Sequence, residues 1–118
     1  MKIGLNRKTI DIEAYDKIFK IGIFPIICDV LIVKHDSLEK EYEKIENPTA
    51  DDVNGKNQAQ YDLQFEILEN LLNANGYDFK KDWWEKHFDS LAISEFIVIS
   101  KSKDAMPTPK KKEQIKSH

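Results

Sequence analysis

One cysteine and three histidines are the residues of this chain best suited to nucleophilic or metal chemistry. Cys28 precedes His35 by seven residues, which is roughly two turns of a helix. A thiolate nucleophile needs a neighbouring base and a lowered pKa. Cys28 instead lies within the apolar run 24–33. This setting favours a small core residue, and a small hydrolase that uses Cys28 with His35 is the competing interpretation.

The candidate metal ligands are His35 with Asp36, and Glu85 with His87. Neither pair has the i, i+4 histidines or the cysteine spacing of a specific metal site. No glycine-rich phosphate cradle is present, and no pair of carboxylates stands out as a general acid and base. The sequence therefore predicts no cofactor, no metal and no catalytic site, and we expect a protein that is not an enzyme.

Trp83, Trp84, His87 and Phe88 form the densest aromatic group of the chain. Successive residues of a helix point about 100° apart, so Trp84 shares a face with Phe88. Trp83 and His87 lie on the adjoining face, and one tryptophan should be partly exposed. The group is either an aromatic plug that closes the core or a partner-binding hot spot. Its acidic neighbours would repel phosphate, which disfavours stacking on nucleic acid bases.

The charge of the chain changes sign near Lys101. Residues 1–100 carry 12 Lys and Arg against 19 Asp and Glu, whereas residues 101–118 carry 6 against 2. The acidic body argues against nucleic acid binding by that part of the chain. We predict one domain over residues 1–100 and a flexible basic arm over residues 101–118. The arm carries Lys110, Lys111 and Lys112, which serve solubility or dock on an acidic surface.

Hydrophobic periodicity predicts a mainly α domain that opens with a β-hairpin. Residues 2–13 alternate in polarity around a turn at 6–8, and a helix over residues 14–21 should follow. A helix that begins near Asp11 is the competing interpretation. Residues 24–33 fit either a helix or a strand. Because they are apolar nearly all round, we expect them to be buried at the centre of the domain.

The middle of the chain predicts a helix, a loop and a second helix. Asp36 and Glu39 match a capping box, so a helix should run from there to about Glu46. Residues 47–56 are rich in turn formers and predict an exposed loop. The apolar spacing over residues 61–72 predicts the strongest helix.

The C-terminal part of the predicted domain contains a glycine helix cap and two further short elements. Gly76 should cap the strong helix in the left-handed conformation. A short helix should carry residues 83–88, and a last helix or strand should carry residues 91–99. No apolar run approaches the roughly 18 residues of a membrane span, and the N-terminus lacks the apolar core of a signal peptide. The sequence therefore predicts a cytoplasmic protein.

This layout resembles the tail assembly chaperones of long-tailed bacteriophages. The resemblance is carried by the opening segment Met1–Glu13, the acidic helical middle and the closing segment Tyr77–Ile97. Members of that family are small proteins that coat the aggregation-prone tape measure protein during tail building. Many are extended by programmed ribosomal frameshifting near the C-terminus, and an adenine run of the slippery kind could encode Lys110 to Lys112. No functional residue of the family is carried over.

The resemblance implies an assembly protein of the host cytoplasm that binds a long helical protein partner. A basic arm that pairs with the acidic body of a neighbour would also favour homo-oligomers. The alternative function is a small acidic antagonist that occupies a basic protein surface by presenting carboxylates in place of phosphates.

Overall fold

The computed structural model describes residues 8–102 of the chain. Its elements, in chain order, are β1 (Ile10–Ala14), β2 (Lys17–Ile21), α1 (Ile26–Glu43), α2 (Ala50–Ala74), α3 (Lys81–His87) and α4 (Ser90–Ser102). The predicted class, mainly α with an N-terminal β-hairpin, is confirmed. Lys101 and Ser102 end α4, and the rest of the predicted arm, with Lys110, Lys111 and Lys112, lies outside the described residues.

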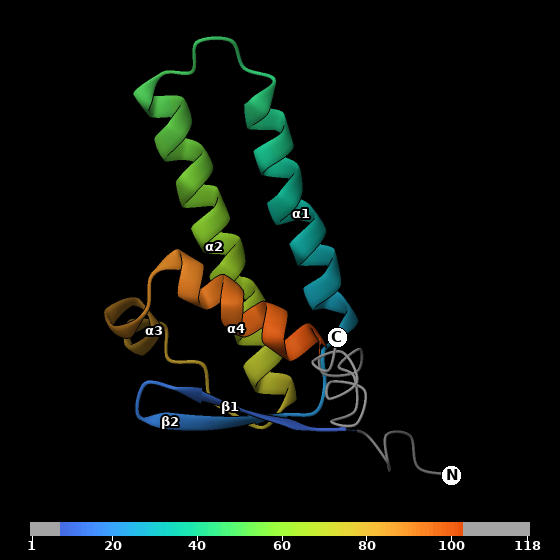
Figure 1. Cartoon of the computed structure of the whole chain (residues 1–118). Coiled ribbons are helices and arrows are strands. Elements are labelled where there is room, and N and C mark those ends of the chain that lie inside the picture. The colour runs from blue at the N-terminus through green and yellow to red at the C-terminus, as the bar shows by residue number, and fades with distance from the viewer. Residues whose placement is uncertain (1–7, 103–118) are drawn as a thin grey trace, which may run out of the picture.

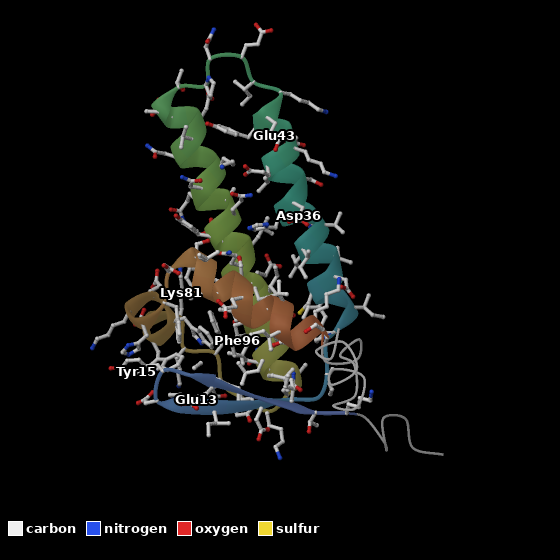
Figure 2. The ribbon with its side chains drawn as sticks, in the orientation of Figure 1. Glu13, Tyr15, Asp36, Glu43, Lys81 and Phe96 are labelled. Carbon is white, nitrogen blue, oxygen red and sulfur yellow. The ribbon has the colours of Figure 1, made fainter. Side chains whose placement is uncertain are left out.

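The long helices α1 and α2 run antiparallel and form a helical hairpin (Figure 1). The strands, α3 and α4 gather around the start of α1 and the end of α2, and together they form a base. The remainder of the helical hairpin projects from this base as a helical arm, which is distinct from the basic arm predicted over residues 101–118. Figure 2 shows Asp36 and Glu43 on the arm, whereas Phe96 lies in the base.

The β-hairpin lies later in the chain than predicted. Its strands pair antiparallel with Ala14 opposite Lys17, so Tyr15 and Asp16 form the turn. The predicted helix over residues 14–21 is wrong, because these residues form the turn and the second strand. The predicted turn at residues 6–8 lies mostly outside the described residues. The side chains that alternate inward from the two strands are Ile12, Ala14, Phe19 and Ile21.

α1 settles the ambiguity of residues 24–33 in favour of a helix, with Pro25 at its N-cap. The capping box predicted at Asp36 is wrong, since Asp36 and Glu39 lie within the continuous helix. The chain instead has its capping box at Thr49, where the Thr49 Oγ1 accepts from the Asp52 N–H at 3.1 Å and the Asp52 carboxylate accepts from the Thr49 N–H at 2.8 Å. The loop predicted over residues 47–56 is therefore helical from Ala50.

The end of α2 is as predicted, with Gly76 at a φ of 86° just beyond the helix. Asn75 next to it ties the β-hairpin to this helix end. Its Oδ1 accepts from the N–H groups of Gly22 and Ile23 at 2.8 and 2.9 Å, and its Nδ2 donates to the Ile23 carbonyl at 2.8 Å. This amide satisfies the backbone where the second strand ends and so fixes the hairpin against α2.

The hydrophobic core lies in the base. Its largest buried side chains come from β2, α1, α2 and α3: Ile21, Leu31, Ile67, Leu68, Leu71, Leu72 and Trp84. In the arm, polar side chains also join the two helices. Lys56 on α2 lies 3.0 Å from the Glu39 carboxylate and 4.5 Å from the centre of the Tyr42 ring. The Lys56 hydrogen bond holds the pKa of Glu39 below its ordinary value.

Candidate functional site

The aromatic group of α3 packs into the space between the β-hairpin and α4. Trp84 is only 1% exposed. Its ring centre lies 5.1 Å from those of Phe88 and Phe96, and 5.6 Å from that of Phe19. Trp84 therefore acts as the plug that joins β2, α3 and α4. A partner cannot reach it in the folded domain.

Trp83 and His87 lie on the adjoining face, as their spacing predicts. Trp83 is half-buried, and its ring centre lies 5.3 Å from that of His87. Tyr15 of the hairpin turn stacks on His87 at 3.9 Å, and the Lys17 ammonium lies 5.1 Å from the centre of the Trp83 ring. Tyr15 has a positive φ of 56°, which is uncommon for a large side chain. Sequence reasoning missed Tyr15, because nothing near it in the chain indicates its contact with His87.

A second surface, which sequence reasoning also missed, lies on α1. Only Cys28 and Leu31 of this helix are buried, so the expected burial of residues 24–33 at the centre of the domain is wrong. Ile26 is 81% exposed and Val33 is 65% exposed. We call the set of exposed apolar side chains that begins just before the helix the α1 outer face: Ile23, Ile26, Ile27, Val30 and Val33.

An apolar groove of about 240 Å³ separates α1 from α4 above α2. Ile32 and His35 line it from α1, and Ile97 and Val98 line it from α4. Gln64 of α2 lies beneath and is almost fully buried. The Gln64 Nε2 donates to the Ser94 hydroxyl at 2.6 Å, and the Gln64 Oε1 accepts from the Ser90 hydroxyl at 2.9 Å. These two hydrogen bonds satisfy both ends of the buried amide.

The two candidate metal-ligand pairs, His35 with Asp36 and Glu85 with His87, are not joined by further ligands within residues 8–102. His35 Nδ1 lies 3.2 Å from Asp36 Oδ1. His87 is stacked on Tyr15. No group of three or more His, Cys, Asp or Glu side chains converges in this described part of the chain.

Cys28 is fully buried, and its thiol donates a weak hydrogen bond to the Ile67 carbonyl at 3.6 Å. Burial, with a smaller contribution from the charge of Asp29, raises the pKa of the thiol from 9.0 to about 11. A nucleophilic cysteine needs the opposite shift and an accessible sulfur. The geometry therefore fits the core interpretation of Cys28 and gives no support to a thiol nucleophile.

We expect Cys28 to react at least about a hundredfold more slowly with a thiol reagent at pH 8 in the folded protein than in urea, because a pKa raised by two units lowers the thiolate fraction by that factor. The rate is measured with a chromogenic aromatic disulfide. The raised pKa also stabilises the fold below pH 9, and this contribution is lost as the pH rises to about 11. Equal rates with and without urea would contradict this placement.

Comparison with known proteins finds no matching family model, no matching curated protein and no matching solved structure. The described part of the chain has no helix of sufficient length and apolar character to cross a membrane.

Proposed function

We propose that this protein is a non-enzymatic protein-binding protein that acts in assembly, and that its α1 outer face binds a helix of a partner protein. One observation carries the proposal: the first half of α1 is apolar nearly all round, with Asp29 paired to Lys101 of α4 as the exception, but it is buried on one side only. A helix that is apolar all round is normally buried, and exposed contiguous apolar patches mark interaction sites. A partner completes the burial that residues 8–102 leave unfinished.

The spacing of the α1 outer face indicates the kind of partner. Ile23, Ile26, Val30 and Val33 recur at intervals of three and four residues, which is the seam that a second helix packs against. The net charge of residues 1–100 is negative. Basic residues beside the apolar seam of the partner would therefore favour association.

The specific form of the proposal is a phage tail assembly chaperone that coats a tape-measure-like protein. A long helical partner repeats its apolar seam along its length, so many copies of one small domain can bind side by side. The basic residues Lys110, Lys111 and Lys112 follow the acidic domain in the chain, and their attraction to a neighbouring copy would favour such an array.

The gene that encodes the chain tests this specific form. We expect a slippery adenine run at the codons for Lys110 to Lys112, an overlapping downstream frame, and genes for tail proteins on either side. If the overlapping frame and the tail genes are both missing, the phage chaperone assignment is wrong. The binding role of the α1 outer face is tested separately, by substitution.

A second candidate function has an observation of its own in its favour. Between residues 41 and 52, at the end of the projecting arm, five carboxylates accompany a single lysine. Such a tip could occupy a basic surface of a nucleic-acid enzyme in place of phosphates. Binding by the tip should weaken steeply as salt is added, because exposed charges are screened. Binding by the apolar α1 outer face should change little under the same conditions.

A further inference from the structure

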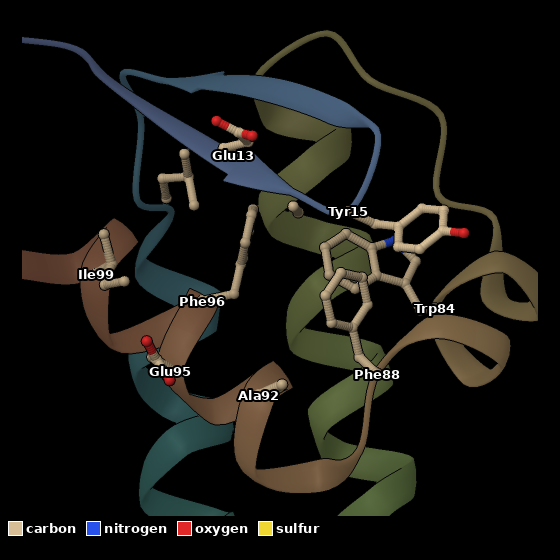
Figure 3. Close-up of a pocket in the computed structure, with 10 residues that line it drawn as sticks. Glu13, Tyr15, Trp84, Phe88, Ala92, Glu95, Phe96 and Ile99 are labelled. Atoms are coloured by element: carbon tan, nitrogen blue, oxygen red, sulfur yellow. The ribbon is translucent and has the colours of Figure 1, made fainter.

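An open cavity of about 160 Å³ lies between β1 and α4, on a different part of the base from the α1 outer face. Ile12 and Ala14 line it from β1, Phe96 from α4, and Trp84 and Phe88 from α3 and the residue after it (Figure 3). The walls are apolar. An apolar cavity of about 150 Å³ is large enough to hold benzene, so this one has room for one aromatic or leucine-sized side chain.

One carboxylate borders the opening of this cavity. Glu95 on α4 is exposed and lies beside Phe96, whereas the Glu13 side chain points away from the cavity, on the opposite face of β1 from Ile12 and Ala14 (Figure 3). None of the residues that line the cavity is basic. The opening is therefore negative beside an apolar interior, and its charge is complementary to a cation held next to an apolar group.

The strand beside the cavity adds a reason to expect a protein segment as the occupant. β1 pairs only with β2, so within residues 8–102 its other edge has no strand partner. An exposed strand edge offers backbone donors and acceptors to an extended segment that lies along it. A segment in this position would place alternate side chains toward the base.

We propose that this cavity is an anchor site for a segment of a partner protein that inserts one aromatic or leucine-sized side chain flanked by Lys or Arg. The inserted side chain contacts Phe88 and Phe96. A flanking cation faces Glu95. This site is independent of the α1 outer face, and either one can be correct without the other.

Capped tripeptides test the proposal on the full chain. Lys-Phe-Lys is compared with Glu-Phe-Glu, which keeps the ring and reverses the charge, and with Lys-Ser-Lys, which keeps the charge and removes the ring. Binding is followed by tryptophan fluorescence and by amide chemical shifts. We expect saturable binding of Lys-Phe-Lys, with shifts centred on Ala14 and Ala92, at least about tenfold tighter than that of either control.

Two variants separate the contributions of charge and cavity. Glu95→Gln should weaken Lys-Phe-Lys binding by about fivefold. Ala92→Leu places a larger side chain at the cavity wall and should abolish binding, while Glu69→Gln, at an exposed position of α2 that does not line the cavity, serves as the control and should leave binding unchanged. Equal binding of the three tripeptides, an absence of saturable binding, or full binding by Ala92→Leu would each overturn the proposal.

Discussion

Replacing Trp84 with alanine lowers the free energy of unfolding by about 3–5 kcal/mol, the largest effect that we expect of any single substitution in this chain. The side chain is 1% exposed and is surrounded by Phe19, Phe88 and Phe96. These rings come from β2, α4 and the end of α3 and are held by the packing of those elements, so removal of the indole leaves a cavity among them. Urea unfolding followed by far-UV circular dichroism measures the loss.

Trp83→Ala is the matched control, because it removes the same side chain from the neighbouring position. Trp83 is half-buried: one part of it packs against the edge of the core and another faces His87 and Tyr15 at the surface. We expect this substitution to cost about 1 kcal/mol. A loss for Trp83→Ala that equals or exceeds that of Trp84→Ala would show that the wrong tryptophan has been placed in the core.

The elements that the sequence predicts best are those whose local signals and tertiary packing agree. The end of α2 is an example, since Gly76 adopts the positive φ that a helix cap needs and the apolar spacing before it is buried in the base. At Asp36 the two disagree. The residues there match a capping box, yet helical hydrogen bonding continues through them because the preceding turns of α1 already pack against α2.

In the candidate surfaces, too, some features follow from the local sequence and others depend on tertiary packing. Helical geometry alone predicts that Trp83 and Trp84 face different ways, but which one is buried depends on Phe19 and Phe96, which are distant in the chain. The apolar character of residues 24–33 is plain in the sequence. The sequence does not show how much of this apolar surface is buried, because the buried fraction depends on how many other elements pack against α1. Within residues 8–102, α2 packs against α1 and α4 borders the groove beside it, while the α1 outer face stays exposed.

A double substitution, Ile26→Asp with Val33→Glu, tests that uncovered face directly. The probe is a helical peptide of about three heptads with Leu at the core positions and Lys on either side of them. We expect the double variant to bind this peptide at least about a hundredfold more weakly than the unchanged protein, because two central apolar contacts are lost. Its free energy of unfolding should change by no more than about 0.5 kcal/mol, since both positions are exposed.

Leu91→Glu is the control for the loss of an exposed apolar side chain. Leu91 lies on α4 and is 77% exposed, against 81% for Ile26, but it is not part of the α1 outer face. Peptide binding should be unchanged in this variant. If Leu91→Glu weakens peptide binding as much as the double substitution does, or if the double substitution does not weaken it, the probe peptide binds elsewhere on the protein.

The sign of the charges makes the double substitution a demanding test. The new carboxylates attract the lysines of the probe peptide, so electrostatics alone would strengthen its binding to the double variant, most of all at low salt. Weaker binding in spite of that attraction can come only from the loss of apolar contact on α1. Tighter binding at low salt that disappears at high salt would instead identify the acidic surface as the binding determinant and favour the antagonist function.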